Sequence, residues 1–139
     1  MSTRAIFAKQ LEDGKYLGGW QWNDGNIIPS ELTKRISTLA EAELLISLGE
    51  WRCLMNRNEK NEHIKFCESL NKNNPKHYAE EEKPKFQKIG KYYVLLKNHK
   101  SVEFNKPQIY DSIEDMLGQD VNYVYVFDTM VNKWIKHKW

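Results

Sequence analysis

Alternation of apolar and polar positions predicts strands at both ends of the chain. Arg4–Lys9 and Tyr16–Trp22 flank the turn residues Asp13 and Gly14, a pattern typical of a β-hairpin. Towards the other end, Val121–Asp128 carries apolar residues on both faces, which indicates a central strand of a sheet. A short link then leads to Lys133–Trp139, which we expect to be the last strand and to lie at a sheet edge.

Three further segments bear on the sheet. Gly18 and Gly19 interrupt the predicted second strand, and such glycines mark a bulge or a close approach of another backbone. The segment Glu50–Met55 is compatible with either a strand or a loop packed on the core. Tyr92–Lys97 and Ser101–Phe104 predict a second hairpin.

Helical signals fill the space between these strands. A short helix is expected to begin at Pro29, a residue that suits the first turn. Thr38 and Glu41 have the spacing of a capping box, and the helix that they begin should end at Gly49. Ser112 is the predicted N-cap of another short helix. We therefore expect several helices, all of them short.

The middle of the chain differs in character. Residues 56–91 are rich in Lys, Glu and Asn, and we expect a polar insertion or mobile loop there, with a short helix near residues 59–70. The whole pattern predicts one domain, residues 1–139, of the α+β class. Its sheet should be mostly antiparallel with about five to six strands, and about two to four short helices should lie on one side of it.

Composition narrows the class of protein. A chain of 139 residues with 40% hydrophobic and 29% charged residues is in the range of a globular domain with its own core. The net charge of +2 is too small for a general nucleic-acid binder, whose affinity comes from neutralising phosphates. No apolar run is long enough for a membrane span and no signal-peptide pattern opens the chain. With only two cysteines, we expect a cytoplasmic protein with free thiols.

The sequence lacks the residue patterns that are typical of catalytic and metal-binding sites. His63 and Cys67 are four residues apart, which on a helix places them on one face, but the paired spacing of a zinc site is missing. Cys53 lacks the surroundings of a nucleophile, and the carboxylates lie beside turns and caps. We therefore expect no catalytic residue, no metal and no cofactor, and we lean towards a protein that is not an enzyme.

Aromatic residues are abundant, at 12% of the chain, and they form the best candidate for a binding surface. Trp20 and Trp22 should share one face of a strand, with Asn23 and Asp24 next to them. Such a pair either stacks on a ligand or partner, or fills the core face of the sheet. The other candidate ligand-binding residues supply cations or rings near the apolar segments: Arg4, Arg35, Trp51 and Arg52.

The chain carries four short sequences in a characteristic order and spacing: Ser2–Ile6, Asp24-Gly25, Leu45–Glu50, and Tyr123–Asp128 followed by Trp134. Together they resemble a group of small proteins that are common in phages and prophages and have no assigned activity. Members often carry a His-x-Asp-Gly-Tyr-Pro-like element where this chain has Trp22–Asn26, so no role of that histidine carries over. The resemblance implies a viral accessory protein in the bacterial cytoplasm.

Three hypotheses of function follow from these observations. The first is a non-enzymatic anti-defence factor that sequesters a nucleotide-like immune signal or blocks a host defence protein. The second is a hydrolase or nuclease acting on a nucleotide, in which Asp24 or His63 would be essential. The third is a nucleic-acid-binding regulator that uses the Lys-rich insertion and the basic terminus. A homo-oligomer is also possible, because a second copy could cover an edge strand that ends at Trp139.

Overall fold

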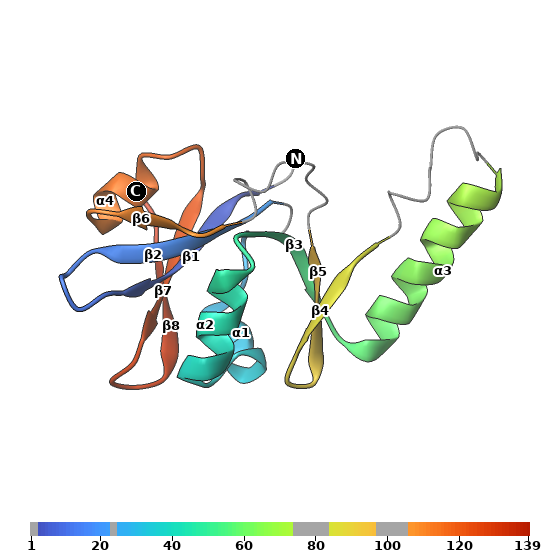
Figure 1. The fold of residues 1–139 in the computed structure, drawn as a ribbon, viewed down its shortest axis with the longest axis horizontal. Helices are drawn as coiled ribbons and strands as arrows, with labels where there is room; N and C mark the ends of the chain where they lie inside the picture. The colour runs from blue at the N-terminus through green and yellow to red at the C-terminus, as the bar shows by residue number, and fades with distance from the viewer. Residues whose placement is uncertain (1–2, 23–24, 74–83, 97–105) are drawn as a thin grey trace.

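The structure is a computed structural model and describes residues 3–22, 25–73, 84–96 and 106–139. These residues form four helices and a sheet of eight strands, so the α+β class is confirmed (Figure 1). The elements in chain order are β1 Ala5–Gln10, β2 Tyr16–Gln21, α1 Pro29–Arg35, α2 Leu39–Ser47, β3 Glu50–Met55, α3 Arg57–Asn73, β4 Phe86–Ile89, β5 Tyr92–Leu96, β6 Gln108–Tyr110, α4 Ile113–Leu117, β7 Tyr123–Asp128 and β8 Lys133–His137.

The sheet is mixed, with the strand order β4-β5-β3-β2-β1-β7-β8 and β6 paired to β2. The predicted β1–β2 hairpin is present, and β7 lies between β1 and β8 as a central strand should. Two of the pairings, β1 with β7 and β2 with β3, are parallel. With eight strands in the sheet, the expected number of five to six was too low. The parallel pairings join strands that are distant along the chain, which local patterns do not reveal.

One edge of β2 is shared by two strands. Tyr16, Leu17 and Gly18 pair with β6, whereas Trp20 and Gln21 pair with β3. The two glycines lie where the partner changes, and both are tightly packed. A side chain at Gly19 would come within 2.9 Å of two backbone carbonyl oxygens at the end of α2, and one at Gly18 would meet Ile6 and Tyr110. The predicted close backbone approach is confirmed.

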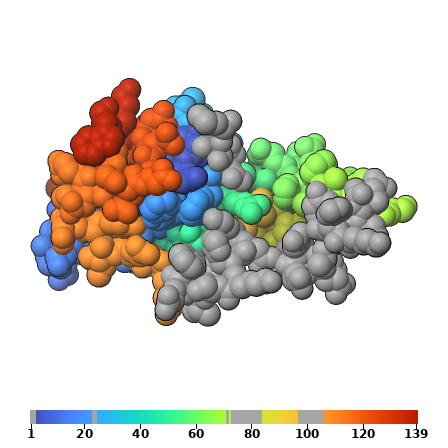
Figure 2. Space-filling model, turned by 90° about the horizontal axis from the view of Figure 1, so that it is seen from above, coloured from blue at the N-terminus to red at the C-terminus, as the bar shows by residue number. Residues whose placement is uncertain are grey.

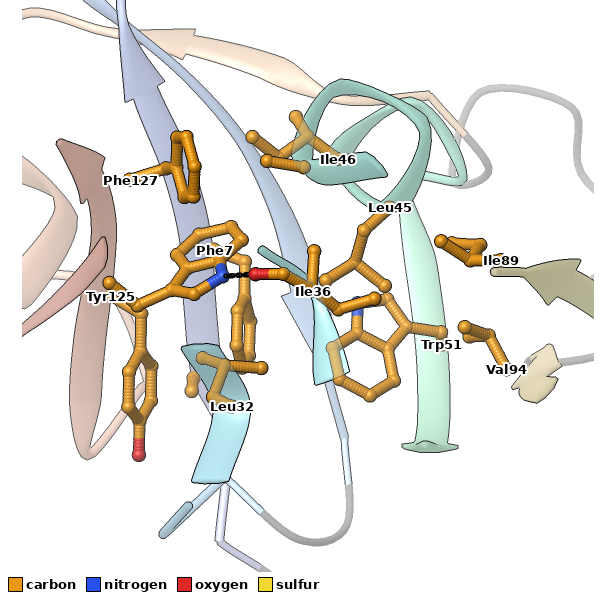
Figure 3. Close-up of a cluster of buried hydrophobic side chains, with 13 residues drawn as sticks. Phe7, Leu32, Ile36, Leu45, Ile46, Trp51, Ile89, Val94, Tyr125 and Phe127 are labelled. Carbon is orange, nitrogen blue, oxygen red and sulfur yellow. Dashed lines mark hydrogen bonds between the residues drawn. The ribbon is translucent and has the colours of Figure 1, made fainter. Parts of the chain in front are cut away.

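Helices cover both faces of the sheet. The larger core cluster lies between the sheet and the pair α1 and α2, and its side chains are drawn in Figure 3. The smaller cluster lies on the opposite face, where Met116 and Leu117 of α4 pack against Ile6, Ala8 and Val124. The expectation that all helices lie on one side was wrong, because β1 and β7 have apolar residues on both faces and each face needs a cover.

The N-terminal ends of α2 and α4 are closed as predicted. The Thr38 hydroxyl accepts from the Glu41 N–H, and the Glu41 carboxylate accepts from the Thr38 N–H, which completes the capping box. The helix stops at Gly49, whose φ of 77° favours glycine. Ser112 caps α4 by accepting from the Asp115 N–H.

The polar middle of the chain contains more regular structure than expected. Helix α3 is longer than the predicted helix, and β4 forms an edge strand that was not predicted. Lys60 and His63 of α3 contact the rings of Tyr93 and Phe86 on the sheet. Val94, the next residue of β5, points into the larger core cluster, so Tyr93 points to the opposite face of the sheet. Because α3 packs on Tyr93, it lies on the face opposite α1 and α2.

Strand β5 pairs with β3 along one edge and with β4 along the other. The expected hairpin partner of Tyr92–Lys97, Ser101–Phe104, lies outside the described residues. At the opposite end of the sheet, α1 lies alongside β8, and the Trp134 N–H donates to the Thr33 hydroxyl at 3.2 Å. The homo-oligomer through this edge stays a prediction.

None of the helices in the described part of the chain is long and apolar enough to cross a membrane. The C-terminal segment, dark red in Figure 2, projects at the edge of that view beside the elements coloured orange. Trp139 is 78% exposed. Its indole N–H still donates to the Leu117 carbonyl at 2.9 Å, so the terminus is held against α4.

Candidate aromatic binding site

Trp20 and Trp22 lie together at the end of β2, as the alternation predicted. Trp20 pairs with Ile6 of β1, and both side chains belong to the face covered by α4. The Trp20 and Trp22 ring centroids are 5.5 Å apart, with 31° between the ring planes. Both side chains are half-buried, so the pair is partly core and partly surface.

Trp20 is held by a hydroxyl from β6. Its Nε1–H donates to the Tyr110 hydroxyl at 2.9 Å, and its ring packs against the smaller core cluster. Burial raises the pKa of Tyr110, and the hydrogen bond from Trp20 lowers it to a lesser extent. The inner half of the pair is therefore fixed in the core.

Trp22 is held by a carboxylate and covered by a cation. Its Nε1–H donates to Oε1 of Glu50, at 2.9 Å. The guanidinium carbon of Arg4 lies 4.9 Å from the centre of the Trp22 ring, within the range of a cation–π contact. Arg4 is also ion-paired with Asp120, whose side chain is 86% exposed. This aromatic site therefore consists of Arg4, Trp20, Trp22, Glu50, Tyr110 and Asp120.

The antiparallel hairpin explains why Arg4 reaches Trp22. Ala5 pairs with Gln21, so the residue before β1 and the residue after β2 lie side by side at the same end of the sheet. The Arg4 backbone is fixed in turn by Asn122, which accepts from the Arg4 N–H and donates to the Arg4 carbonyl. The cation is therefore held over the ring by the backbone on which it is mounted.

Trp51 and Arg35, two other predicted site residues, lie on the opposite face of the sheet. Trp51 is fully buried in the larger core cluster, with its ring centroid 5.0 Å from that of Phe7. Arg35 stacks over the Tyr92 ring at 5.1 Å and donates to the Leu54 carbonyl at 3.2 Å. Trp51 and Arg35 therefore do not lie with Trp20 and Trp22, because β3 and α1 place them against the α1–α2 core.

The remaining predicted site residues are near β2 in sequence or register. Arg52 is exposed on β3 at an irregularity of the strand, and its carbonyl accepts from the amide of Gln21. Asn23 and Asp24 lie outside the described residues. The structure thus brings together Arg4, Trp20 and Trp22 of the eight residues proposed from the sequence.

Three residues of the aromatic site escaped the sequence reasoning. Glu50 comes from a segment that was compatible with strand or loop, and its parallel pairing with Trp20 places it on the same face. Tyr110 lies in a strand of three residues, too short to show alternation. Asp120 follows the end of α4, and its position does not distinguish it from the other carboxylates beside turns. Only the pairing of distant strands brings these residues to the tryptophans.

The predicted proximity of His63 and Cys67 on α3 is confirmed, with 3.5 Å between Nε2 and Sγ. Burial raises the pKa of the Cys67 thiol, which disfavours the thiolate form needed for metal binding or nucleophilic attack. Among the described residues, no group of three or more His, Cys, Asp and Glu side chains is placed to hold a metal ion.

No protein-family model matches the chain, and searches of curated proteins and of solved structures gave no match.

Proposed function

We propose that this chain is a non-enzymatic accessory protein of a phage or prophage that binds and blocks a host defence protein in the bacterial cytoplasm. The observation that carries the proposal is the stack of Arg4 on Trp22 beside Trp20 at one end of the sheet. Trp, Tyr and Arg are the residues that most often dominate the binding energy of protein interfaces. Here all three types converge, held by internal hydrogen bonds before any partner arrives.

The charges of the aromatic site favour a protein over a nucleotide-like signal. The Arg4 cation is accompanied by two carboxylates, Glu50 and Asp120, so the formal charge of the site is negative. Phosphate groups are bound by clusters of cations and backbone N–H donors. Both indole N–H groups already donate within the molecule and are not free to read the edge of a base.

Preorganisation supports the same choice. A partner loses less free energy in ordering the site when the side chains are already fixed. Arg4 is restrained by Trp22 and Asp120, whereas an exposed arginine on its own would have to be ordered on binding. The Asp120 side of this ion pair is 86% exposed, and exposed pairs contribute at most about 1 kcal/mol, so a partner can displace Asp120 at little cost.

The test is capture of a host protein by the tagged chain from a lysate of the bacterial host, followed by a binding constant with the purified partner. Arg4→Ala and Trp22→Ala should each weaken binding by more than about tenfold, as expected for central interface residues. Trp139→Ala is the matched control, because it removes an exposed tryptophan that is not among the six residues of the aromatic site and that donates to the Leu117 carbonyl instead. Circular dichroism would verify that each variant is folded.

Other outcomes would overturn the proposal. Equal binding by the Arg4, Trp22 and Trp139 variants would show that the partner docks elsewhere. Isothermal titration with cyclic nucleotides and ADP-ribose derivatives tests the sequestering alternative, and heat from one of them that is lost in Trp22→Ala would favour it. Repeated conversion of such a compound into product would show an enzyme instead.

A further inference from the structure

The backbone segment from Gly25 to Ile27, which follows the aromatic site in the chain, is held from two sides. On one side, the Gly25 N–H donates to the Thr3 carbonyl at 3.0 Å. On the other side, the Tyr125 hydroxyl lies 2.6 Å from the Gly25 carbonyl oxygen and 2.9 Å from that of Ile27. The same hydroxyl accepts from the Ile27 N–H at 2.7 Å. The segment is thus fixed between β1 and β7.

Gly25 makes direct contact with the backbone that carries Arg4. A Cβ atom at Gly25 would lie 2.8 Å from the Arg4 carbonyl carbon and 3.1 Å from Ala5 Cβ. Real Cβ atoms do not approach backbone this closely, so only glycine fits without a shift. The position of the Gly25 backbone therefore limits where the Arg4 backbone can lie.

Tyr125 is well suited to hold this segment in one place. Its ring is fully buried and stacks on Phe7, while its hydroxyl points away from the centre of the cluster (Figure 3). Burial raises the pKa of Tyr125 to about 12, so the hydroxyl keeps its proton and can donate it to one carbonyl at a time. Lys136 adds a third anchor, because its Nζ donates to the Asn26 side chain at 2.6 Å.

We propose that Tyr125 is a positioning residue for the Arg4–Trp22 stack. Its hydroxyl fixes Gly25, Gly25 fixes the Thr3–Arg4 backbone, and this backbone holds the guanidinium over the indole. The role of that stack in partner binding rests on the proposed function, whereas the dependence of the stack on Tyr125 can be measured on the purified chain alone.

The test compares Tyr125→Phe with Tyr123→Phe by NMR and circular dichroism. Tyr123 lies on the same strand and the same side of the sheet, so its variant loses a hydroxyl nearby and is the matched control. The first readout is the ring-current shift that Trp22 causes at the side-chain N–H of Arg4. The Trp22→Ala variant, which lacks this ring, gives the reference chemical shift. The second is the exciton signal of the Trp20–Trp22 pair.

Tyr125→Phe should lose most of the Arg4 ring-current shift and weaken the exciton signal, and Tyr123→Phe should retain both. Wild-type values in folded Tyr125→Phe would overturn the proposal and leave Tyr125 a purely structural role. Gly25→Ala is the second variant, since its Cβ presses on the Arg4 backbone, and an unchanged Arg4 shift there would also contradict the proposal. Failure of Arg4→Ala to affect partner capture would instead count against the proposed function and leave this result unaffected.

Discussion

The rings of Phe7 and Tyr125 stack in parallel, with 4.7 Å between their centroids and 10° between their planes. Phe7 also contacts Trp51 at 5.0 Å and the edge of Trp134 at 5.6 Å. These four rings come from β1, β3, β7 and β8, so Phe7 joins strands from across the sheet into one aromatic core. The same stack orients the Tyr125 ring from which the hydroxyl reaches Gly25 and Ile27.

Replacement of Phe7 by alanine should therefore be severely destabilising. Phe7→Ala removes a fully buried ring and leaves a cavity, and the free energy of unfolding should fall by about 3–5 kcal/mol. Phe66→Ala, at a side chain that is 60% exposed on α3, should change it by less than about 0.5 kcal/mol. Urea denaturation measures both, and similar losses for the two variants would contradict the placement of Phe7.

Gly19 should tolerate no side chain. Gly19→Ala places a Cβ 2.9 Å from the carbonyl oxygens of Ile46 and Gly49, which are backbone atoms and cannot move aside cheaply. We expect a loss of about 1–3 kcal/mol in thermal or urea unfolding. Gly118→Ala is the control, because its φ is −73° and its nearest neighbours are at 3.4 Å. A Gly19 variant as stable as the Gly118 variant would refute the close approach of α2 to β2.

The hydrogen bond between Trp20 and Tyr110 should appear as a coupling in a double-mutant cycle. Trp20→Phe and Tyr110→Phe each remove one partner, and their coupling energy should be about 0.5–1.5 kcal/mol. The cycle of Trp22→Phe with Tyr110→Phe should give a smaller value, because the Trp22 N–H donates to Glu50 instead. Additive effects of Trp20 and Tyr110 would mean that the bond contributes nothing to stability.

Alkaline pH should weaken the fold through Tyr125. Burial raises the pKa of Tyr125 from the ordinary 10.0 to about 12, so between these values the folded state keeps a proton that the unfolded state has lost. The contribution of Tyr125 is therefore complete below about pH 10 and disappears as pH rises through about 12, a loss on the order of 3 kcal/mol. Urea denaturation across this range measures it. In Tyr125→Phe the fall should be smaller, and an equal fall in both proteins would assign it to other groups.

Several elements could be predicted because their signals are local. The Thr38–Glu41 capping box and the Ser112 cap each join residues three positions apart. The β1–β2 hairpin follows from a turn between two alternating segments, and the two apolar faces of β7 follow from its own sequence. In each case the atoms that interact are neighbours along the chain, so the sequence pattern describes the contact itself.

Other elements depend on partners far along the chain. Strand β6 contains only three residues and is stabilised by pairing with the first half of β2. Strand β4 lies in a polar stretch of sequence that gives no strand signal, and it forms by pairing with β5. Placement of α4 opposite α1 and α2 follows from the second apolar face of β1 and β7. These contacts arise from hydrogen bonding and burial between distant segments, which no local window contains.

The aromatic site shows the same division. Period-two alternation alone determined that Trp20 and Trp22 share a face, because the side chains of a strand alternate whatever the rest of the chain does. The tertiary structure decided that Arg4 covers Trp22 and that Glu50 and Tyr110 accept hydrogen bonds from the two indole N–H groups. It also decided that Trp51 and Arg35 lie on the other face. The physical reason is that strand pairing selects which distant side chains meet, and this selection is made by the sheet as a whole.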